Sequence, residues 1–281
     1  MIAARDAWVG GAERLAARGI ESARLDARVL LAHVMDIGTD ELLSARSPNA
    51  GQLARYEELL DRRAAHEPVA YITGEREFWS LSFGVGPGVL VPRPETETLI
   101  EAMLKHFPDR GSELDILDLG TGSGCLLISS LREFRKAKGT GVDRSERALR
   151  FAKANAEKLG VADRCTWFHS DWTAAGKTFD VILANPPYLA ESEAAALPPD
   201  IAQYEPREAL ISGADGYEAY RAIAQVLLDG LKPKGRAFLE VGAGQSATAG
   251  YILSARGLEI LGVTSDLLGI PRCMAVGLGS G

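Results

Sequence analysis

The chain has 281 residues, of which 46% are hydrophobic and 25% charged, and its formal net charge is −7. This length and composition predict a globular protein with one large domain and one small domain. The acidic balance argues against an extended nucleic-acid surface. No apolar stretch approaches the ~18–20 residues of a membrane span.

The N-terminal residues lack the basic region and compact apolar core of a secretory signal. The three cysteines, Cys125, Cys165 and Cys273, cannot all pair and have no C-x-x-C spacing, so we expect reduced thiols. Both observations predict a cytoplasmic protein. We expect no membrane partner, no direct nucleic-acid partner and no metal site.

Residues 1 to about 65 carry apolar residues at helical spacing, as in the stripe Val9, Ala12, Leu15 and Ala16. Glycines and a Ser-Pro-Asn turn interrupt the pattern, which predicts four or five short helices in a domain over residues 1–75. Alternating apolar residues and glycines over 78–91 then predict a β-hairpin, within a linker over 76–93. Pro94 suits the first turn of a helix that runs to about His106.

From Asp115 onward, apolar strands alternate with helical segments, the pattern of a parallel sheet with helices on both faces. The last two strands follow one another without a helix, so we expect them to pair antiparallel. Residues 94–281 are therefore predicted to form an α/β domain with a seven-stranded, Rossmann-like sheet. The predicted strands are 115–119, 139–143, 165–170, 179–184, 236–241, 258–264 and 272–278.

A glycine-rich loop, Gly120-Thr121-Gly122-Ser123-Gly124, follows the first strand of this domain and precedes an apolar helical segment. Glycines at the carboxyl end of a parallel strand let the backbone turn sharply and approach a ligand. The dinucleotide fingerprint needs another glycine where Cys125 stands. The loop therefore predicts a nucleoside cofactor that lacks a pyrophosphate.

Acidic residues follow the next two strands. Asp143 ends its strand, where a carboxylate can accept hydrogen bonds from both ribose hydroxyls; a helix cap is the alternative role. Asp171 can accept a hydrogen bond from the amino group of adenine. Trp172 can cover the face of the base, with core packing as the alternative. These residues predict the remainder of the nucleoside site.

The segment Asn185-Pro186-Pro187-Tyr188 follows the apolar strand 179–184. Pro187 keeps Pro186 extended, and neither proline can donate a hydrogen bond. The Asn185 side-chain oxygen and the Pro186 carbonyl can therefore hold a planar group with two N–H donors, on which Tyr188 can stack. An ordinary strand-ending turn is the alternative. Cofactor loop and cradle together predict methyl transfer from S-adenosylmethionine to a planar nitrogen, with no histidine required.

Several further blocks resemble the glutamine N5-methyltransferases of peptide chain release factors, the HemK type. The resemblance covers residue 67 to the C-terminus, whereas the first 65 residues match by helical pattern more than by motif. The segment 211–216 departs from the family, which usually has a glycine pair there. Besides the motifs above, the matching blocks are Glu67–Gly74, Val89–Glu97 with its Pro-Arg-Pro-Glu-Thr-Glu run, Val142–Ser145, Ser170–Trp172, Tyr204–Leu210 and Leu239–Gly242 followed by Gln245.

The resemblance implies the class I S-adenosylmethionine-dependent methyltransferase fold with an N-terminal helical bundle. It implies that the enzyme methylates the glutamine of the GGQ motif of release factors, with the Asn-Pro-Pro-Tyr segment as catalytic and substrate-binding site. We expect the helical domain to dock this large protein substrate, and we expect a monomer. Arg93 and Glu95 could start a helix or face the substrate; Glu205 and Arg207 could line the peptide entrance or form a surface ion pair.

Two other functions compete with this interpretation. A nucleic-acid amino-methyltransferase acting on adenine, cytosine or guanine would need to capture phosphates and, on a duplex, flip the base. The acidic balance and the lack of a basic tract argue against it. A cofactor-binding interaction module without catalysis is the other alternative, and the intact Asn-Pro-Pro-Tyr segment argues against that.

Overall fold

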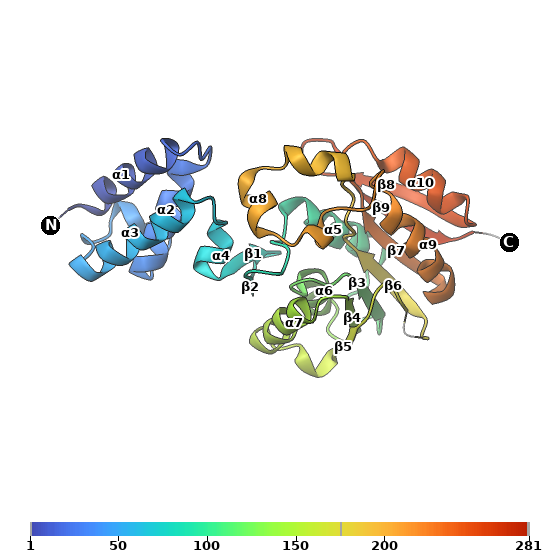
Figure 1. Ribbon diagram of the computed structural model, residues 1–281. Helices are drawn as coiled ribbons and strands as arrows, with labels where there is room; N and C mark the ends of the chain where they lie inside the picture. The colour runs from blue at the N-terminus through green and yellow to red at the C-terminus, as the bar shows by residue number, and fades with distance from the viewer. Residues whose placement is uncertain (1, 175, 280–281) are drawn as a thin grey trace. The chain divides into compact units, whose positions relative to one another are not determined.

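The computed structural model describes residues 2–174 and 176–279, and the chain divides into two compact units. The first unit contains Met1–Glu75 together with Pro198–Tyr204 (Figure 1). The second contains Arg76–Leu197 and Glu205–Gly281. Among the described residues, no helix has the length and apolar character needed to cross a membrane.

The first unit is helical, as its apolar periodicity predicts. Leucines on the inner helix faces form its core, and Leu15, Leu30 and Leu59 are completely buried. A reciprocal capping box starts the third helix, because the side chains of Asn49 and Gln52 each accept a hydrogen bond from the other's backbone N–H, at 2.9 Å. The elements are α1 (Ala4–Ala16), α2 (Ala23–Met35), η1 (Glu41–Leu43), α3 (Ala50–Ala64) and α4 (Val69–Thr73).

A segment from much later in the chain completes this unit. It contains α8 (Pro199–Tyr204). The Tyr204 hydroxyl donates to the Ala65 carbonyl at 2.8 Å. The guanidinium of Arg63 lies 3.7 Å from Asp200 and also donates to the buried Asp26 at 2.7 Å. This insertion could not be predicted from the sequence, because its contacts join residues more than a hundred positions apart.

A β-hairpin follows the helices. Its strands are β1 (Glu75–Phe78) and β2 (Leu81–Gly84), so it lies earlier in the chain than the predicted 78–91. The turn residues Trp79 and Ser80 have φ angles of 52° and 57°, which matches the right-handed twist of a two-residue hairpin loop. Residues 85–91, all described, form no strand; the apolar alternation there reflects burial of Val85, Val89 and Val91.

The second unit is built on a seven-stranded sheet of order β5-β4-β3-β6-β7-β9-β8. The first five strands in this order run parallel, and β9 pairs antiparallel with both β7 and β8. This confirms the predicted sheet and its antiparallel final pair. The strands are β3 (Asp115–Leu119), β4 (Lys138–Asp143), β5 (Cys165–His169), β6 (Phe179–Ala184), β7 (Leu231–Glu240), β8 (Leu258–Ser265) and β9 (Pro271–Leu278).

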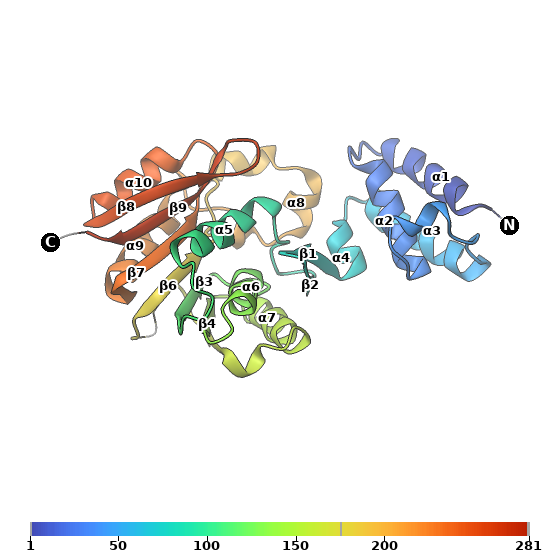
Figure 2. The same ribbon diagram turned by 180° about the vertical axis from the view of Figure 1, so that it is seen from behind.

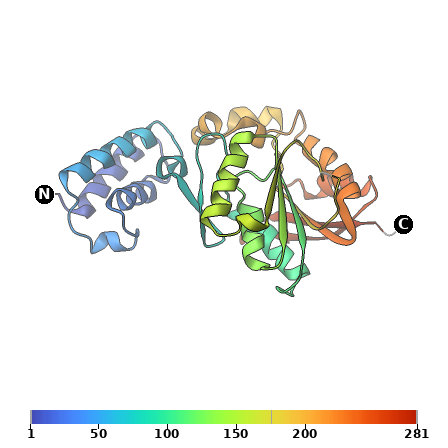
Figure 3. The same ribbon diagram turned by 90° about the horizontal axis from the view of Figure 1, so that it is seen from below.

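Helices cover both faces of this sheet, because alternate strand residues point to opposite sides. Ile116 packs in one apolar cluster with α5 and α6, whereas Leu117 packs in the other with α9 and α10. Figure 1 shows α9 and α10 on the near side, Figure 2 shows α5 on the opposite side, and Figure 3 shows helices on either side of the strands. The helices are α5 (Glu97–His106), α6 (Cys125–Glu133), α7 (Glu146–Lys158), α9 (Glu218–Gly230) and α10 (Ser246–Ser254), with short 3-10 turns η2 (Pro94–Thr96), η3 (Ala162–Arg164), η4 (Glu191–Ala196) and η5 (Arg207–Ala209).

The strand order reverses beside β3. From β3 the chain moves outward to β4 and β5, then returns to the other side of β3 with β6 and continues to β7. Open α/β sheets bind ligands at such a switch point, outside the carboxyl ends of the strands. The glycine loop leaves β3 at this edge, and the Asn-Pro-Pro-Tyr segment leaves β6 beside it.

Candidate active site

The strand register brings the predicted site residues to one edge of the sheet. Leu119, the last residue of β3, pairs with Val142 of β4 and with Ala184 of β6. Ala184 pairs in turn with Leu239 of β7. The residues that follow these four positions are Gly120, Asp143, Asn185 and Glu240. The glycine loop, Asp143 and the Asn-Pro-Pro-Tyr segment therefore start at the same level of the sheet.

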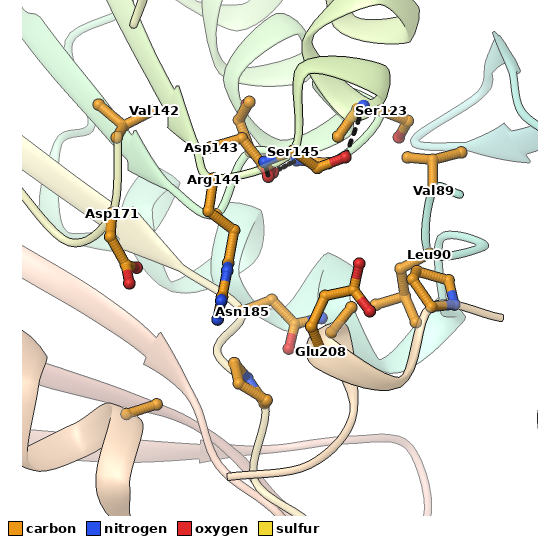
Figure 4. A pocket seen from close by; sticks show the side chains of 18 of the residues that line it. Val89, Leu90, Ser123, Val142, Asp143, Arg144, Ser145, Asp171, Asn185 and Glu208 are labelled. Carbon is orange, nitrogen blue, oxygen red and sulfur yellow. Dashed lines mark hydrogen bonds between the residues drawn. The ribbon is translucent and has the colours of Figure 1, made fainter. Parts of the chain in front are cut away.

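A cavity of about 410 Å³ opens at this edge, and all of its lining residues belong to the second unit. This volume is within the range of small-molecule sites. Asp143, Asp171 and Asn185 surround the cavity (Figure 4). The other predicted site residues in its lining are Gly120, Thr121, Gly122, Ser123, Trp172 and Pro187; Gly124, Pro186 and Tyr188, which the structure also describes, are outside it.

The glycine loop needs glycine for two different reasons. Gly120, Gly122 and Gly124 have φ angles of 70°, 57° and 81°, a conformation that other residues rarely adopt. A Cβ at Gly122 would meet no atom closer than 3.9 Å, so this position faces the open cavity. A Cβ at Gly124 would lie 2.9 Å from Ile128 and 3.2 Å from Ala152. Gly122 therefore keeps ligand space open, whereas Gly124 permits close packing of α6 and α7.

A buried acid that the sequence analysis did not select supports this loop. Asp118 of β3 is 1% exposed, and its Oδ2 accepts a hydrogen bond from the Thr121 hydroxyl at 2.6 Å. Burial raises the pKa of the Asp118 carboxyl to about 7. Asp118 therefore fixes the loop from beneath, and it lies outside the cavity lining.

Asp143 is held in place by backbone amides. Its Oδ2 accepts from Gly122 N–H and its Oδ1 from Ser145 N–H, both at 2.8 Å. Burial raises the pKa of the Asp143 carboxyl, and these two hydrogen bonds oppose that rise. The N-cap of α7 is Ser145, whose side chain accepts from Ala148 N–H. Each Asp143 oxygen retains accepting capacity, which suits a pair of ribose hydroxyls.

Asp171 and Trp172 lie on the same rim. Asp171 is exposed, and its side chain accepts a hydrogen bond from Trp172 N–H at 3.1 Å. The Trp172 ring is half-buried against the apolar cluster under α9, and a Cβ at Gly120 would lie 3.7 Å from it. The tryptophan thus packs on the apolar cluster and also lines the cavity.

A chain of hydrogen bonds lies behind Asn185. Its Nδ2 donates to the Thr96 hydroxyl at 3.1 Å, and this hydroxyl donates to Glu240 Oε2 at 2.6 Å. The Tyr188 hydroxyl lies 3.3 Å from the other Glu240 oxygen. Burial raises the pKa of the Glu240 carboxyl to about 7. With Nδ2 occupied on the protein side, the Asn185 oxygen remains for a ligand.

The roles of Arg93, Glu95, Glu205 and Arg207 were left open by the sequence, and the structure places them in three different arrangements. Glu205 is buried and accepts hydrogen bonds from Val91 N–H at 3.1 Å and from Arg93 at 2.5 Å. This pair ties the loop before α5 to the segment after α8. Arg207 instead pairs with Glu191 where both side chains are exposed. For Glu95 the structure shows that its carbonyl accepts from the Thr98 hydroxyl, at 2.7 Å.

Comparison with known proteins identifies the family. The PrmC N-terminal domain matches residues 6–74, and the methyltransferase small domain matches residues 95–202. The release factor glutamine methyltransferase of Cereibacter sphaeroides is 45% identical, over 98% of both chains. The chain belongs to the release factor glutamine methyltransferase family. The Caulobacter vibrioides relative of the same name is 37% identical over 93% of this chain and 91% of its own.

The resemblance to release factor glutamine methyltransferases is thereby confirmed, and so is the α/β methyltransferase fold. A methyltransferase structure from Pyrococcus furiosus shares this fold, with a TM-score of 0.52 at 17% identity, and covers 81% of this chain and 99% of its own. The roles of individual residues, in contrast, are not tested by these comparisons. These roles stay predictions, and the distances and hydrogen bonds above say which atoms each role would use.

The cavity fits S-adenosylmethionine, the cofactor of this methyltransferase. Gly122 leaves room for close approach of a ligand, and Asp143 offers two carboxylate oxygens where ribose hydroxyls are expected. Asp171 and Glu208 add acidic groups to the lining, which suits a sulfonium cation. Within the described part of the chain, no group of three or more His, Cys, Asp or Glu residues is arranged to hold a metal ion.

Sequence reasoning selected part of the cavity lining but did not select Thr96, which also lines the cavity, or Asp118 and Glu240, which lie outside the lining. Glu240 is the last residue but one of the predicted strand 236–241 and ends β7 in the structure, where it lies in the same register row as Asp143. An acid at a strand end beside the switch point was therefore the available signal. Thr96 had no comparable signal, because its partners Asn185 and Glu240 are 89 and 144 positions away.

Proposed function

We propose that this chain transfers a methyl group from S-adenosylmethionine to the side-chain nitrogen (N5) of a glutamine, in the GGQ motif of peptide chain release factors. Membership of the release factor glutamine methyltransferase family supports the reaction. One structural observation carries the assignment of the site. The Asn185 carboxamide is anchored through its nitrogen, beside the cofactor loop, so its oxygen is available to a substrate amide.

A carboxamide nitrogen is a poor nucleophile, because its lone pair is delocalised into the carbonyl. When bound, S-adenosylmethionine supplies an electrophilic methyl group on a sulfonium. The Asn185 oxygen would accept one N–H of the substrate glutamine, and the Pro186 carbonyl would accept the other. With both protons held on the protein side, the nitrogen lone pair is directed at the methyl group. The catalytic contribution of the loop is thus positioning.

The packing of Tyr188 refines its proposed role. Its hydroxyl is directed at Glu240, and its ring packs on the apolar cluster under α9. Burial raises the pKa of this hydroxyl well above its ordinary value, so it stays protonated at neutral pH. We assign Tyr188 to the wall that flanks the substrate amide, with the hydroxyl as its anchor.

The first unit would dock the protein substrate. A side-chain amide needs little surface, whereas a release factor offers a large one. The matched PrmC N-terminal domain at residues 6–74 supports a role particular to this family. We propose a monomer as the active species. We place the reaction in the cytoplasm, where release factors act; size-exclusion chromatography tests the monomer.

The deciding assay incubates the enzyme with S-adenosylmethionine and a purified release factor, then maps added methyl groups by mass spectrometry. We expect one methyl group on the GGQ glutamine. A release factor with this glutamine replaced by alanine is the matched control and should stay unmodified. Methylation of ribosomal RNA or DNA in parallel reactions, with none on the release factor, would favour a nucleic-acid amino-methyltransferase instead.

A further inference from the structure

We propose that Thr96 and Glu240 are positioning residues that set the direction of the Asn185 carboxamide, so that its oxygen and not its amino group faces the substrate. This inference rests on the proposed function, which requires an acceptor at that point. Thr96 is the fifth residue of the Pro-Arg-Pro-Glu-Thr-Glu run, and Glu240 ends β7. The inference therefore also gives that run a part in the reaction.

The direction follows from counting protons. A threonine hydroxyl has one proton, and the 2.6 Å contact places it on Glu240 Oε2. At 3.1 Å from Asn185, the same hydroxyl oxygen must then accept, and the group that donates to it is Nδ2. Thr96 is 2% exposed and Glu240 is 1% exposed, so bulk water does not compete for these positions.

The reversed carboxamide is disfavoured by the same contacts. If Asn185 turned by half a rotation, its oxygen would face a hydroxyl oxygen whose proton is already given to Glu240. Two acceptors would then oppose each other in a buried site, and each would lose its hydrogen bond. The cavity would receive an NH₂ group, which repels the N–H groups of a substrate amide. The buried carboxylate thus fixes an acceptor at the cavity through two hydrogen bonds.

The protonation state of Glu240 supports this mechanism. Burial raises the pKa of this carboxyl to about 7; the hydrogen bond from Thr96, the charge of Arg272 and the hydrogen bond from Tyr188 lower it, and Glu95 raises it. A protonated Glu240 can donate to Thr96, which frees the threonine proton for an Asn185 oxygen and permits the reversed carboxamide. Turnover should therefore rise as pH increases through about 7. The charge of Glu240 also raises the pKa values of three neighbouring groups, Tyr220, Cys125 and Cys273.

The test compares Thr96→Val, which removes the hydroxyl at nearly constant shape, with Thr96→Ser, which keeps it. Thr96→Val should lower kcat on the release factor by about 10- to 100-fold, with unchanged affinity for S-adenosylmethionine. Thr96→Ser should restore most of the rate. The matched control is Thr98→Val: Thr98 is 5% exposed, its hydroxyl donates to the Glu95 carbonyl, and this variant should keep full turnover.

A double mutant separates positioning from general support of the fold. If Thr96 acts through Asn185, Thr96→Val should cause no further loss of kcat in an Asn185→Ala background. Multiplied losses in the double mutant would overturn the proposal, and so would wild-type kcat in Thr96→Val. Glu240→Gln should flatten the rise of turnover near pH 7, because glutamine can accept from Thr96 at every pH. A rise identical to that of wild type would contradict the role of Glu240.

A readout without substrate keeps this test independent of the proposed function. The Asn185 side-chain NH₂ resonance, identified by its loss in Asn185→Ala, should shift in Thr96→Val and stay in place in Thr98→Val. An unchanged resonance in Thr96→Val would refute the hydrogen-bond chain. If the resonance shifts but wild-type enzyme leaves release factors unmodified, the chain stands and the proposed substrate is wrong.

Discussion

Three acidic residues at the carboxyl edge of the sheet are buried, and their burial changes their pKa values. Asp118, Asp143 and Glu240 are at most 9% exposed, and burial raises the pKa of each. A buried carboxyl group destabilises the fold when it ionises. We therefore expect such groups where their hydrogen bonds position another part of the site. Here Asp118 accepts from Thr121 and Asp143 accepts from Gly122 N–H, which fixes the glycine loop, and Glu240 accepts from Thr96. The ribose contacts of Asp143 and the control of the Asn185 carboxamide by Glu240 are our proposals.

Asp143→Ala should weaken binding of S-adenosylmethionine by about 1.5–3 kcal/mol per hydrogen bond lost to the carboxylate. The loss includes a contribution from the loop, because Gly122 N–H also loses its acceptor. Turnover at saturating cofactor should change little. Isothermal titration calorimetry measures the affinity; an unchanged dissociation constant would make Asp143 a purely structural residue.

Asp118→Asn should stabilise the protein in a pH-dependent manner. The pKa of Asp118 is about 7 in the folded state, above its ordinary value near 4, so between these values the folded protein holds a proton that the unfolded chain has released. The stability contributed by the neutral carboxyl is therefore present below about pH 4 and lost as pH rises to about 7. Asparagine stays neutral and can still accept from Thr121.

The melting temperature of Asp118→Asn, relative to wild type, should thus increase from about pH 4 to about pH 7 and then level off. Differential scanning calorimetry at several pH values measures this difference. A difference that does not vary with pH would show that Asp118 ionises at its ordinary pKa.

How far residues could be predicted depends on whether their partners are local. Asp143 and Asn185 were predictable, because Asp143 ends a strand, Asn185 directly follows another, and parallel strands end at one edge of the sheet. Thr96 was not, because its role comes from hydrogen bonds to Asn185 and Glu240, which the fold alone brings together. Arg93 and Glu205 show the same limit: 112 positions separate the two members of that pair.

At the scale of elements, the alternation of strand and helical segments was sufficient to predict the sheet. All seven predicted strands are present, including β4, whose sequence Lys-Gly-Thr-Gly-Val-Asp is not an apolar run. Periodicity was insufficient for the hairpin, where buried valines outside any strand imitate alternation over 85–91. The bend between β1 and β2 depends instead on Trp79 and Ser80 in the left-handed region, which neither residue type favours.

The glycine loop allows a paired test of this element. Gly122→Ala should weaken cofactor binding while the protein stays folded, because its Cβ would enter open cavity space. Gly124→Ala should lower the melting temperature, because its Cβ would press on Ile128 and Ala152 where α6 and α7 pack. Both positions have positive φ, so the strain of an alanine there is common to the two variants.

Titration calorimetry and thermal melting, carried out on both variants, measure the contrast. The assignment of Gly122 to the cofactor would fail if Gly122→Ala bound S-adenosylmethionine as tightly as wild type. A Gly124→Ala protein with unchanged melting temperature would show that α6 and α7 can separate without cost.

At the scale of the whole molecule, the first unit is assembled from two stretches of chain. Residues 198–204 leave the second unit after the Asn-Pro-Pro-Tyr segment and η4, and return to it at Glu205. The cavity lining, in contrast, is complete within the second unit. Substrate docking and cofactor binding should therefore be separable by truncation.

A chain that begins at Arg76 should still bind S-adenosylmethionine, because it retains every lining residue of the cavity. It should lose most activity on an intact release factor and much less on a short glutamine peptide, if the helical unit docks the protein. Turnover on the two substrates measures the difference. Equal losses on both would make the helical unit a folding partner of the second unit, and full activity on the intact protein would end the docking hypothesis.

A full-length Tyr204→Phe variant is the control for the truncation, because it removes the hydrogen bond to Ala65 and leaves the helical unit in place. Its activity on both substrates should be close to that of wild type.

The insertion of α8 also determines how this protein can be recombined with its relatives. A chimera that takes the first 75 residues from another family member would unite foreign helices with a native α8. Tyr204 would then need a matching carbonyl, and Asp200 a matching guanidinium, in a helix that did not evolve beside them. The exchangeable module is therefore discontinuous: residues 1–75 and 198–204 should be swapped together, at three junctions instead of one.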